Sequence, residues 1–337
     1  MLRSALLLAT LAPAVSAQTV WFVDDDAGSG ADFNDLQSAV DAASPGDRIE
    51  VLPGNYPDFA VISKGITVMA ETPGTALMGS LSLDGLPAGE LLVLADLNYG
   101  PSAGIVALSC AGTVLVDGGS ARFSTFGCDD LRIRGVRSNS LSFRDSFVQV
   151  TDADGTVGGI FVSNSTAILS NVTSEGSDGF VETGFGCTIT DADPGLECRD
   201  SDVWVMDCSF TGGDGDIGPS PTCDAFPENG ISARNSTVHI ARTETRSGSQ
   251  FPFGTGVSPS IDAFSSQVLQ DDSLAAMQLR GGNRVGETAE FVIRAGTGTV
   301  GRHWAGRTPL RVPFGATLAV LHSSARGVSR GGLPAGG

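Results

Sequence analysis

A repeat of 35 to 36 residues constrains the fold of this chain more than any other feature. Residues 159–165, 195–201 and 230–236 align without gaps, and their first glycines are 36 and then 35 residues apart. Each unit has a short strand, an Asn-Ser or Asp-Ser turn, a second alternating strand and a long loop rich in Gly and Asp. Such a unit cannot bury its apolar side alone, so we expect the units to stack. Short strands at this period, without helices between them, favour a coil of parallel strands over a βαβ sheet.

The same alternation continues upstream with shorter loops, and the solenoid is expected from about residue 48 to about residue 250. The open edge at its start needs a cover. Residues 32–43 supply one, because Phe33, Leu36, Val40 and Ala43 recur at helical spacing behind an aspartate. This pattern predicts a short capping helix that feeds into the first strand.

Residues 31–56 read Ala-Asp-Phe-Asn-Asp-Leu-Gln-Ser-Ala-Val-Asp-Ala-Ala-Ser-Pro-Gly-Asp-Arg-Ile-Glu-Val-Leu-Pro-Gly-Asn-Tyr and are followed by Ile66, Thr67 and Val68. This stretch closely resembles the N-terminal cap and first coil of pectin-lyase-like right-handed β-helix proteins. The resemblance implies an all-β chain folded as a right-handed parallel β-helix. It leaves function open, since that fold carries lyases, hydrolases, esterases, adhesins and non-catalytic proteins. The Gly- and Asp-rich repeats also look like exported β-helix proteins of environmental bacteria.

Residues 1–17 have the pattern of a secretory signal peptide, with Arg3, an apolar run and small residues at Val15 and Ala17. We therefore expect cleavage near Ala17, a secreted or cell-surface location, and no transmembrane segment. Residues 18–257 are expected to form the β-helix with its cap. Residues 258–337 are expected to form a small basic, antiparallel β module with a flexible Gly-rich tail, because eight arginines follow residue 279.

The formal net charge is −18. An acidic surface repels nucleic acid, which we exclude as a partner. It also opposes polyanionic sugars unless cations mediate the contact.

Six cysteines in an exported chain predict disulfides. Cys187 and Cys223 are 36 residues apart, one repeat, and Cys110 and Cys128 are 18 apart, about one short coil. Cys198 and Cys208 then pair by elimination, or stay buried thiols.

The residues that enzymes of this fold would need are mostly missing. The resemblance to galacturonan hydrolases implies Gly-His-Gly and Arg-x-Lys segments, and resemblance to pectin esterases implies an Asp-x-x-Phe-Gly segment; the sequence contains none of them. One local basic patch stands out in the acidic body. The candidate substrate-binding residues are Arg132, Arg134, Arg144, Asp129 and Asp130. Arg132 and Arg134 should project from one outward strand face, either to bind an anionic sugar or to pair with acidic neighbours.

Calcium is a candidate ligand, because three Gly-rich loops each place two carboxylates two residues apart. The candidate ligands are Asp152, Asp154, Asp191, Asp193, Asp214 and Asp216. The same residues are ordinary turn formers, which is the favoured interpretation. Asn164, Asn171 and Asn235 match the glycosylation pattern, but Asn164 and Asn235 share one repeat position and are interpreted as turn residues.

The sequence thus favours an exported, non-catalytic β-helix protein that presents a stacked surface to a carbohydrate or cell-surface component. The alternatives are a lyase-like carbohydrate-active enzyme acting on a uronate-containing glycan and a calcium-stabilised structural protein.

Overall fold

The computed structural model describes residues 18–26, 30–100, 102–154, 156–183, 187–216, 225–249, 261–264, 266–271, 284–285, 290–294 and 317–321. The predicted signal peptide, residues 1–17, and the predicted Gly-rich tail lie outside these residues.

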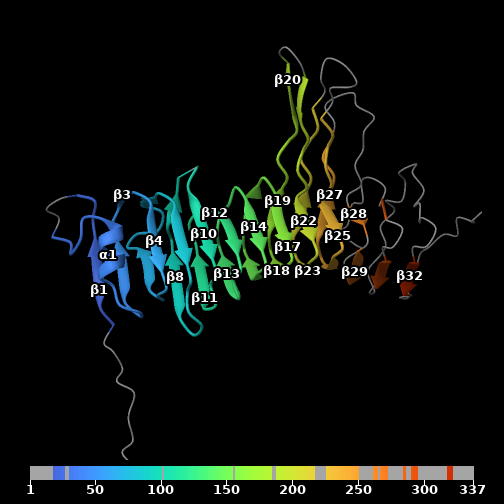
Figure 1. Ribbon diagram of the computed structural model, residues 1–337. Helices are drawn as coiled ribbons and strands as arrows, with labels where there is room; N and C mark the ends of the chain where they lie inside the picture. Colours follow the sequence, from blue (N-terminus) through green and yellow to red (C-terminus); the bar gives the residue numbers. More distant parts are fainter. Residues whose placement is uncertain are drawn as a thin grey trace, which may run out of the picture.

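The chain forms a right-handed parallel β-helix with three faces (Figure 1). Sheet 1 has 13 strands, in the order β1 (Val20–Val23), β2 (Arg48–Val51), β5 (Thr67–Ala70), β8 (Leu91–Ala95), β11 (Thr113–Asp117), β13 (Asp130–Arg134), β15 (Phe147–Thr151), β18 (Thr166–Ser170), β23 (Asp202–Met206), β26 (Thr237–Ala241), β29 (Gln267–Asp271), β31 (Glu290–Arg294) and β32 (Thr317–Leu321). Sheet 2 has ten strands, in the order β4 (Phe59–Ile62), β7 (Leu81–Asp84), β10 (Gly104–Leu108), β12 (Arg122–Phe126), β14 (Leu141–Arg144), β17 (Ile160–Ser163), β22 (Leu196–Arg199), β25 (Ile231–Arg234), β28 (Ile261–Phe264) and β30 (Arg284–Val285).

The third face consists of shorter strands. One end is formed by β3 (Gly54–Tyr56), β6 (Ala76–Met78) and β9 (Asn98–Tyr99), and the other by β16 (Thr156–Val157), β19 (Thr173–Glu175), β24 (Ser209–Thr211) and β27 (Glu244–Arg246). Isolated bridges through Ser120, Arg137 and Asp154 connect the two ends. The face is therefore continuous along the solenoid.

The strands stack because alternate side chains enter one shared core. In the predicted repeats, Ile160 pairs with Leu196 and Leu196 with Ile231, so the three aligned segments are neighbouring strands of sheet 2. Buried and more exposed positions alternate along most of the strands whose side chains are described; on β23, Val203 and Val205 are buried. The residues between them face solvent, and these outward rows are the surfaces available for binding.

A short helix closes the N-terminal end. Helix α1 (Leu36–Ala42) begins after Asp35, whose carboxylate accepts a hydrogen bond from the Ser38 N–H at 2.8 Å. Hydrogen bonds from the Ser38 side chain and backbone lower the pKa of Asp35. The sequence predicts a start at residue 32, but the Asp32 carboxylate instead accepts from the Phe22 N–H at 2.9 Å. The cap is therefore present, and its helix is shorter than expected.

Two corners of the coil use residues with left-handed backbone. The first corner, between sheets 2 and 1, contains Ser63, Ser109, Asp145, Asn164, Asp200 and Asn235; the second, between sheet 1 and the third face, contains Asp96, Asp152, Asn171, Asp207 and Arg242. Asn and Asp tolerate positive φ better than most residues. Asn164 (φ 48°) and Asn235 (φ 50°) are thus turn residues, as their shared repeat position predicts.

A column of buried hydroxyls, the serine ladder, runs just after the first corner; its members are Ser146, Ser165, Ser201, Ser236 and Ser266. Ser201 shows the pattern. Its hydroxyl donates to the Arg199 carbonyl at 2.6 Å and accepts from the Ser165 N–H of the preceding coil at 3.2 Å. The ladder satisfies backbone groups that would otherwise be buried without partners.

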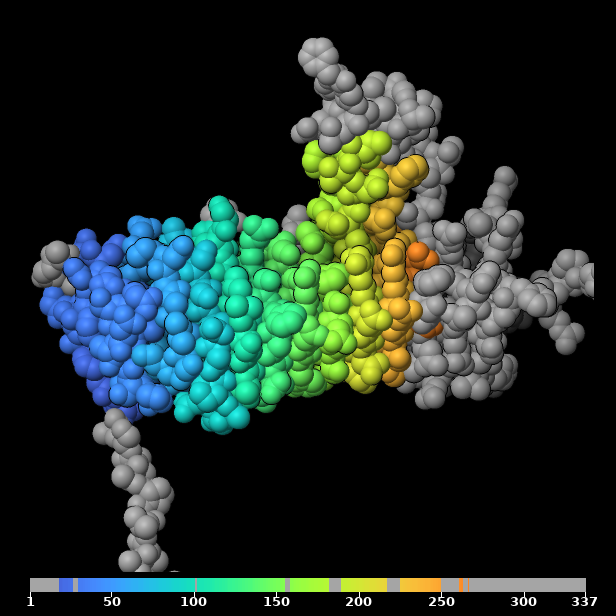
Figure 2. All heavy atoms as spheres, viewed as in Figure 1, coloured from blue at the N-terminus to red at the C-terminus, as the bar shows by residue number. Residues whose placement is uncertain are grey.

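The long loops of the repeats form an arm that projects from the body (Figures 1 and 2). The arm contains the described parts of residues 176–195, 212–229 and 247–249, including the antiparallel hairpin of β20 (Phe180–Thr183) and β21 (Cys187–Thr190). Its loops stack through backbone hydrogen bonds such as Gly213 N–H to Asp193 O at 2.9 Å. A Cβ on Gly213 would lie 2.0 Å from the Ser177 carbonyl oxygen, so this close stacking requires glycine.

The antiparallel pairing predicted after residue 258 is wrong. Strands β28 to β32 pair parallel and extend sheets 1 and 2. Apolar alternation has the same period in parallel and antiparallel strands, so it does not reveal strand direction. The boundary predicted at residue 258, between the β-helix and a separate C-terminal β module, stays a prediction. No described helix has the length and apolar character that crossing a membrane requires.

Candidate functional site

The predicted arginine patch is divided between two faces of the solenoid. Asp130, Arg132 and Arg134 lie on β13 and point outward from sheet 1, as the alternation predicts, with Asp129 exposed just before that strand. Arg144 lies on β14 in sheet 2, so it does not belong with them. The two strands are consecutive among the named strands, but the chain passes through the third face at Arg137 between them.

On sheet 1 the charge of Arg132 is matched by its neighbour. Its guanidinium makes a bidentate contact with Asp130, with Nε–Oδ1 at 2.9 Å and NH2–Oδ2 at 2.8 Å. Hydrogen bonding from Arg132 lowers the pKa of Asp130, and the Thr113 hydroxyl adds a further contact at 2.9 Å. Arg132 is therefore paired with an acidic neighbour, which is one of the two interpretations that the sequence leaves open.

On sheet 2 a different cluster gathers around Phe161, which points outward from β17. The guanidinium carbons of Arg144 and Arg199 both lie 5.3 Å from the centroid of its ring. Arg199 also contacts Glu197, with Nε–Oε1 at 2.7 Å. Arg234 stands beside Arg199 on the next coil. We call Arg144, Phe161, Arg199 and Arg234 the arginine–phenylalanine cluster.

The cluster has a net positive charge. Within the part of the chain that the structure describes, no acidic side chain lies within ion-pair distance of Arg144 or Arg234. Only Arg199 is matched, by Glu197. The sequence could not reveal this grouping, because its members are up to 90 residues apart and meet only through the register of sheet 2.

A shallow groove of about 300 Å³ on sheet 2 leads toward the cluster. Its polar lining consists of Ser80, Ser102, Arg122, Ser124, Ser140 and Ser142. Ser142 is the direct strand neighbour of Phe161, so the groove and the cluster form one continuous surface. That surface offers hydroxyls, cations and two aromatic rings, Phe161 and the exposed Phe126, which is the strand neighbour of Arg144.

Glu228 lies near the base of the arm and is about half-buried. Burial raises its pKa, a hydrogen bond from Asn229 opposes this, and the charges of Asp191, Asp262 and Glu197 raise it further. The buried Asn229 donates from Nδ2 to the Glu228 carboxylate at 3.1 Å. Among the described residues, Glu228 is the carboxyl group whose pKa is raised above its ordinary value.

The six predicted calcium ligands are spread over the second corner and the arm. Asp152 accepts from Asn171 Nδ2 at 2.7 Å, and Asp193 accepts from the Ser177 hydroxyl. In the arm, Asp191, Asp214 and Asp216 accept backbone N–H bonds from neighbouring loops at 3.2, 2.6 and 3.1 Å.

Asp154 is exposed and forms an isolated β-bridge with Arg137 on the third face. Among the described residues, no three His, Cys, Asp or Glu side chains converge as metal ligands. The carboxylates instead hold turns and loops together, and a calcium site stays a prediction.

Cys110 and Cys128 occupy equivalent positions in neighbouring coils, just before the serine ladder, and are free thiols in the structure. The Cys128 N–H donates to the Ser146 hydroxyl at 3.1 Å, so the two cysteines continue the ladder. A hydrogen bond between the two side chains lowers the pKa of Cys110 to about 7. The predicted disulfide is not formed here, although its partners are in contact.

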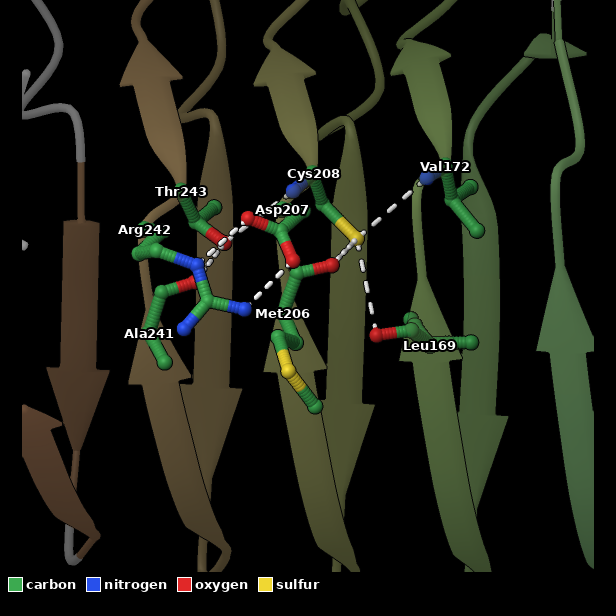
Figure 3. A network of polar contacts seen from close by, with 8 residues as sticks. All are labelled: Leu169, Val172, Met206, Asp207, Cys208, Ala241, Arg242 and Thr243. Carbon is green, nitrogen blue, oxygen red and sulfur yellow. Dashed lines mark hydrogen bonds and ion pairs between the residues drawn. The ribbon is translucent and has the colours of Figure 1, made fainter.

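The disulfide predicted by elimination between Cys198 and Cys208 is not formed either, and both are buried free thiols. Cys198 points into the core from β22, whereas Cys208 lies just after the second corner (Figure 3). The Cys208 sulfur contacts the carbonyls of Met206 at 3.1 Å and Leu169 at 3.5 Å. The sulfur is therefore held by the backbone of its own and the preceding coil. The Cys187 side chain and Cys223 lie outside the described residues.

The chain matches no protein-family model and no curated protein. Alignments with solved structures cover most of this chain at low sequence identity and low TM-score. The A-module of Azotobacter vinelandii mannuronan C-5 epimerase AlgE6 is 11% identical, with 84% of this chain and 94% of that chain covered and a TM-score of 0.40.

Two lyases align over a similar length. The PL6 family alginate lyase AlyGC is 12% identical, with 85% of this chain and 52% of that chain covered and a TM-score of 0.25. A mannuronic acid specific polysaccharide family 6 lyase from human gut microbiota is 11% identical, with 91% and 92% covered and a TM-score of 0.23.

Proposed function

We propose that this protein is exported and binds an acidic, uronate-containing polysaccharide along the outward surface of sheet 2. The observation that carries the proposal is the arginine–phenylalanine cluster, in which Arg144 and Arg199 flank Phe161 and Arg234 continues the row. The proposal moves the binding surface from the Arg132 and Arg134 patch of sheet 1 to sheet 2.

The chemistry of the cluster suits a chain of carboxylated sugars. Guanidinium groups bind carboxylates in bidentate geometry, and they bind better where no acidic neighbour competes. Arg144 and Arg234 meet that condition among the described residues, whereas Arg132 is occupied by Asp130. Strands of one sheet are about 4.8 Å apart, so Arg199 and Arg234 stand on adjacent strands along the solenoid axis, and Arg144 stands two strands before Arg199, with Ser163 between them.

Binding without turnover is the favoured form of this proposal. Eliminative cleavage of a uronate needs a base beside the sugar. Lys64 is the one lysine in the sequence, and its Nζ donates to the carbonyls of Val40 and Ala43 at the end of α1, at 2.5 and 3.0 Å. His239, the histidine among the described residues, lies on sheet 1.

The test is calorimetric titration of residues 18–337 with polygalacturonate, alginate and a neutral glucan. We expect binding to the acidic polymers that weakens with added salt, and a loss of about tenfold or more in affinity for the Arg144→Ala, Arg234→Ala double variant. Arg132→Ala is the matched control, because it removes an exposed arginine that is already paired, and it should bind as the parent does.

Product analysis in the same samples separates binding from catalysis. Shortened, unsaturated chains would replace the non-catalytic form of the proposal with the lyase alternative. Equal losses from Arg132→Ala and from the double variant would mean that general charge, and not the cluster, attracts the polymer. No binding of either acidic polymer would overturn the proposal.

A further inference from the structure

The thiols of Cys110 and Cys128 occupy the same place in two neighbouring coils. Their strands β10 and β12 pair with Leu108 opposite Phe126, and each cysteine follows two residues later, just past the first corner. The coils stay paired at this point, since the Asp129 N–H donates to the Cys110 carbonyl at 2.8 Å. Neighbouring strands are about 4.8 Å apart, within the Cα–Cα range of about 4.4–6.8 Å that a disulfide needs. The backbone therefore already has the spacing for a bond between the two sulfurs.

The two sulfurs face each other inside the core. The Cys110 and Cys128 side chains are 0% and 1% exposed, and they hydrogen-bond to each other. The Cys110 sulfur also contacts the Leu108 carbonyl at 3.4 Å, two residues before it, as the ladder serines do. Serine hydroxyls in neighbouring coils can exchange hydrogen bonds only. Two thiols in the same positions can also be oxidised to a covalent bond.

The contact between the thiols also favours reaction at one of them. The Cys128 side chain stabilises a thiolate at Cys110 and lowers the pKa of Cys110 to about 7, while the same contact raises the pKa of Cys128. By contrast, burial raises the pKa of the Cys198 and Cys208 thiols. The thiolate is the form that attacks a disulfide. Cys110 is thus the sulfur that reacts first, with Cys128 in place for the second step.

We propose that Cys110 and Cys128 form a disulfide that joins two neighbouring coils, and that this bond forms and breaks only while those coils are open. The oxidant is a small disulfide such as oxidised glutathione. The Cys110 thiolate attacks one of its sulfurs and releases the first small thiolate. The Cys128 sulfur, after losing its proton, attacks the Cys110 sulfur of the mixed disulfide and releases the second. Two protein thiols lose two electrons, and the oxidant leaves as two thiols that carry the two protons.

Burial determines when this exchange takes place. Thiol–disulfide exchange requires the oxidant or reductant to reach a sulfur, and in the closed coils both side chains are buried. The first corner must therefore open, either during folding or by partial unfolding. Once the coils have closed, the dithiol and the disulfide are both protected from exchange. The redox state of the folded protein then depends on the conditions under which it folded.

The test compares residues 18–337 refolded with oxidised glutathione and with reduced glutathione. Peptide mapping by mass spectrometry should find a cross-link between Cys110 and Cys128 in the first sample. In the second sample both should be thiols that resist iodoacetamide until urea is added. Calorimetry should give a thermal midpoint about 5 °C or more higher for the cross-linked form, because the bond closes a loop of about 18 residues in the unfolded chain.

Two variants separate this pair from the other cysteines. The Cys110→Ser, Cys128→Ser double variant should fold, since Ser146 fills the same place one coil later, and its midpoint should not depend on the glutathione used. Cys198→Ala is the matched control, because it removes a buried free thiol elsewhere in the core and should keep the difference between the two samples.

Three results would contradict the inference. The first is recovery of Cys110 and Cys128 as free thiols after refolding with oxidised glutathione. The second is rapid alkylation of both thiols in the folded, reduced protein, because it would show that closed coils do not protect them. The third is a midpoint difference that persists in the double-serine variant, which would assign the stabilisation to other cysteines.

Discussion

At the scale of single residues, the serine ladder is the feature with the most direct energetic consequence. Ser201→Ala would leave the buried Ser165 N–H and the Arg199 carbonyl without the hydroxyl that now bonds both. Because an unsatisfied buried polar group costs about 1–3 kcal/mol, we expect a loss of that size in the free energy of unfolding. Urea denaturation measures it.

Two controls accompany this prediction. Ser124→Ala changes an exposed serine on sheet 2 and should alter stability by less than about 0.5 kcal/mol. Ser201→Cys should fall between parent and Ser201→Ala, since Cys128 fills the equivalent place one coil before Ser146. A Ser201→Ala protein as stable as Ser124→Ala would mean that water replaces the hydroxyl.

The sequence predicts the turn residues of the first corner, but it does not predict the hydrogen bonds of the serine ladder. Asn164 and Asn235 are recognisable as turn residues, because an asparagine in a repeated Asn-Ser pair signals its own backbone conformation. The ladder serines carry no such signal, since the partner of the Ser165 N–H is 36 residues away. Likewise, the spacing of Cys110 and Cys128 places them correctly in neighbouring coils and says nothing about whether their sulfurs bond.

At the scale of elements, the arm depends on glycines that let its loops approach closely. A methyl group at Gly213 would lie 2.0 Å from the Ser177 carbonyl oxygen, which belongs to the backbone of the preceding loop. We expect Gly213→Ala to separate these loops, with a cost of about 1–3 kcal/mol that is confined to the arm. Hydrogen exchange should become faster in residues 176–195 and 212–216, while the amides of sheets 1 and 2 keep their protection.

Gly100→Ala is the control for this change, because a Cβ there meets nothing closer than 3.9 Å. Faster exchange throughout sheet 2 in Gly213→Ala would show that the arm and the body unfold as one unit. Unchanged exchange in the arm would show that the loops can move apart without loss.

Strands themselves are predictable from apolar alternation, and so is the helical cap. Apolar alternation does not predict which strands belong to the same sheet, because the length of the coils varies and the corners are short. Arg132 and Arg144 illustrate this, since they are 12 residues apart in sequence and the chain crosses the third face between them, which places them on different faces. The arginine–phenylalanine cluster forms for the same reason, from residues that only the register brings together.

At the scale of the whole molecule, the solenoid is a charged body in which each coil contacts mainly its neighbours. A net charge of −18 opposes the compact state through self-repulsion. Exposed ion pairs such as Arg132–Asp130 contribute little against this. Stability should therefore depend on the solvent ions as well as on the core.

We expect the thermal midpoint to rise with sodium chloride, because the screening length falls from about 30 Å at 0.01 M to about 8 Å at 0.15 M ionic strength.

Calcium chloride tests whether binding at a specific site stabilises the protein beyond charge screening, with magnesium chloride at the same concentration as the control. Since Asp191, Asp214 and Asp216 already accept backbone hydrogen bonds, we expect calorimetry to give the same midpoint in both salts. A midpoint several degrees higher in calcium, reversed by a chelator, would show that these carboxylates leave their turns to bind the ion. In that case the arm would be a calcium-stabilised element.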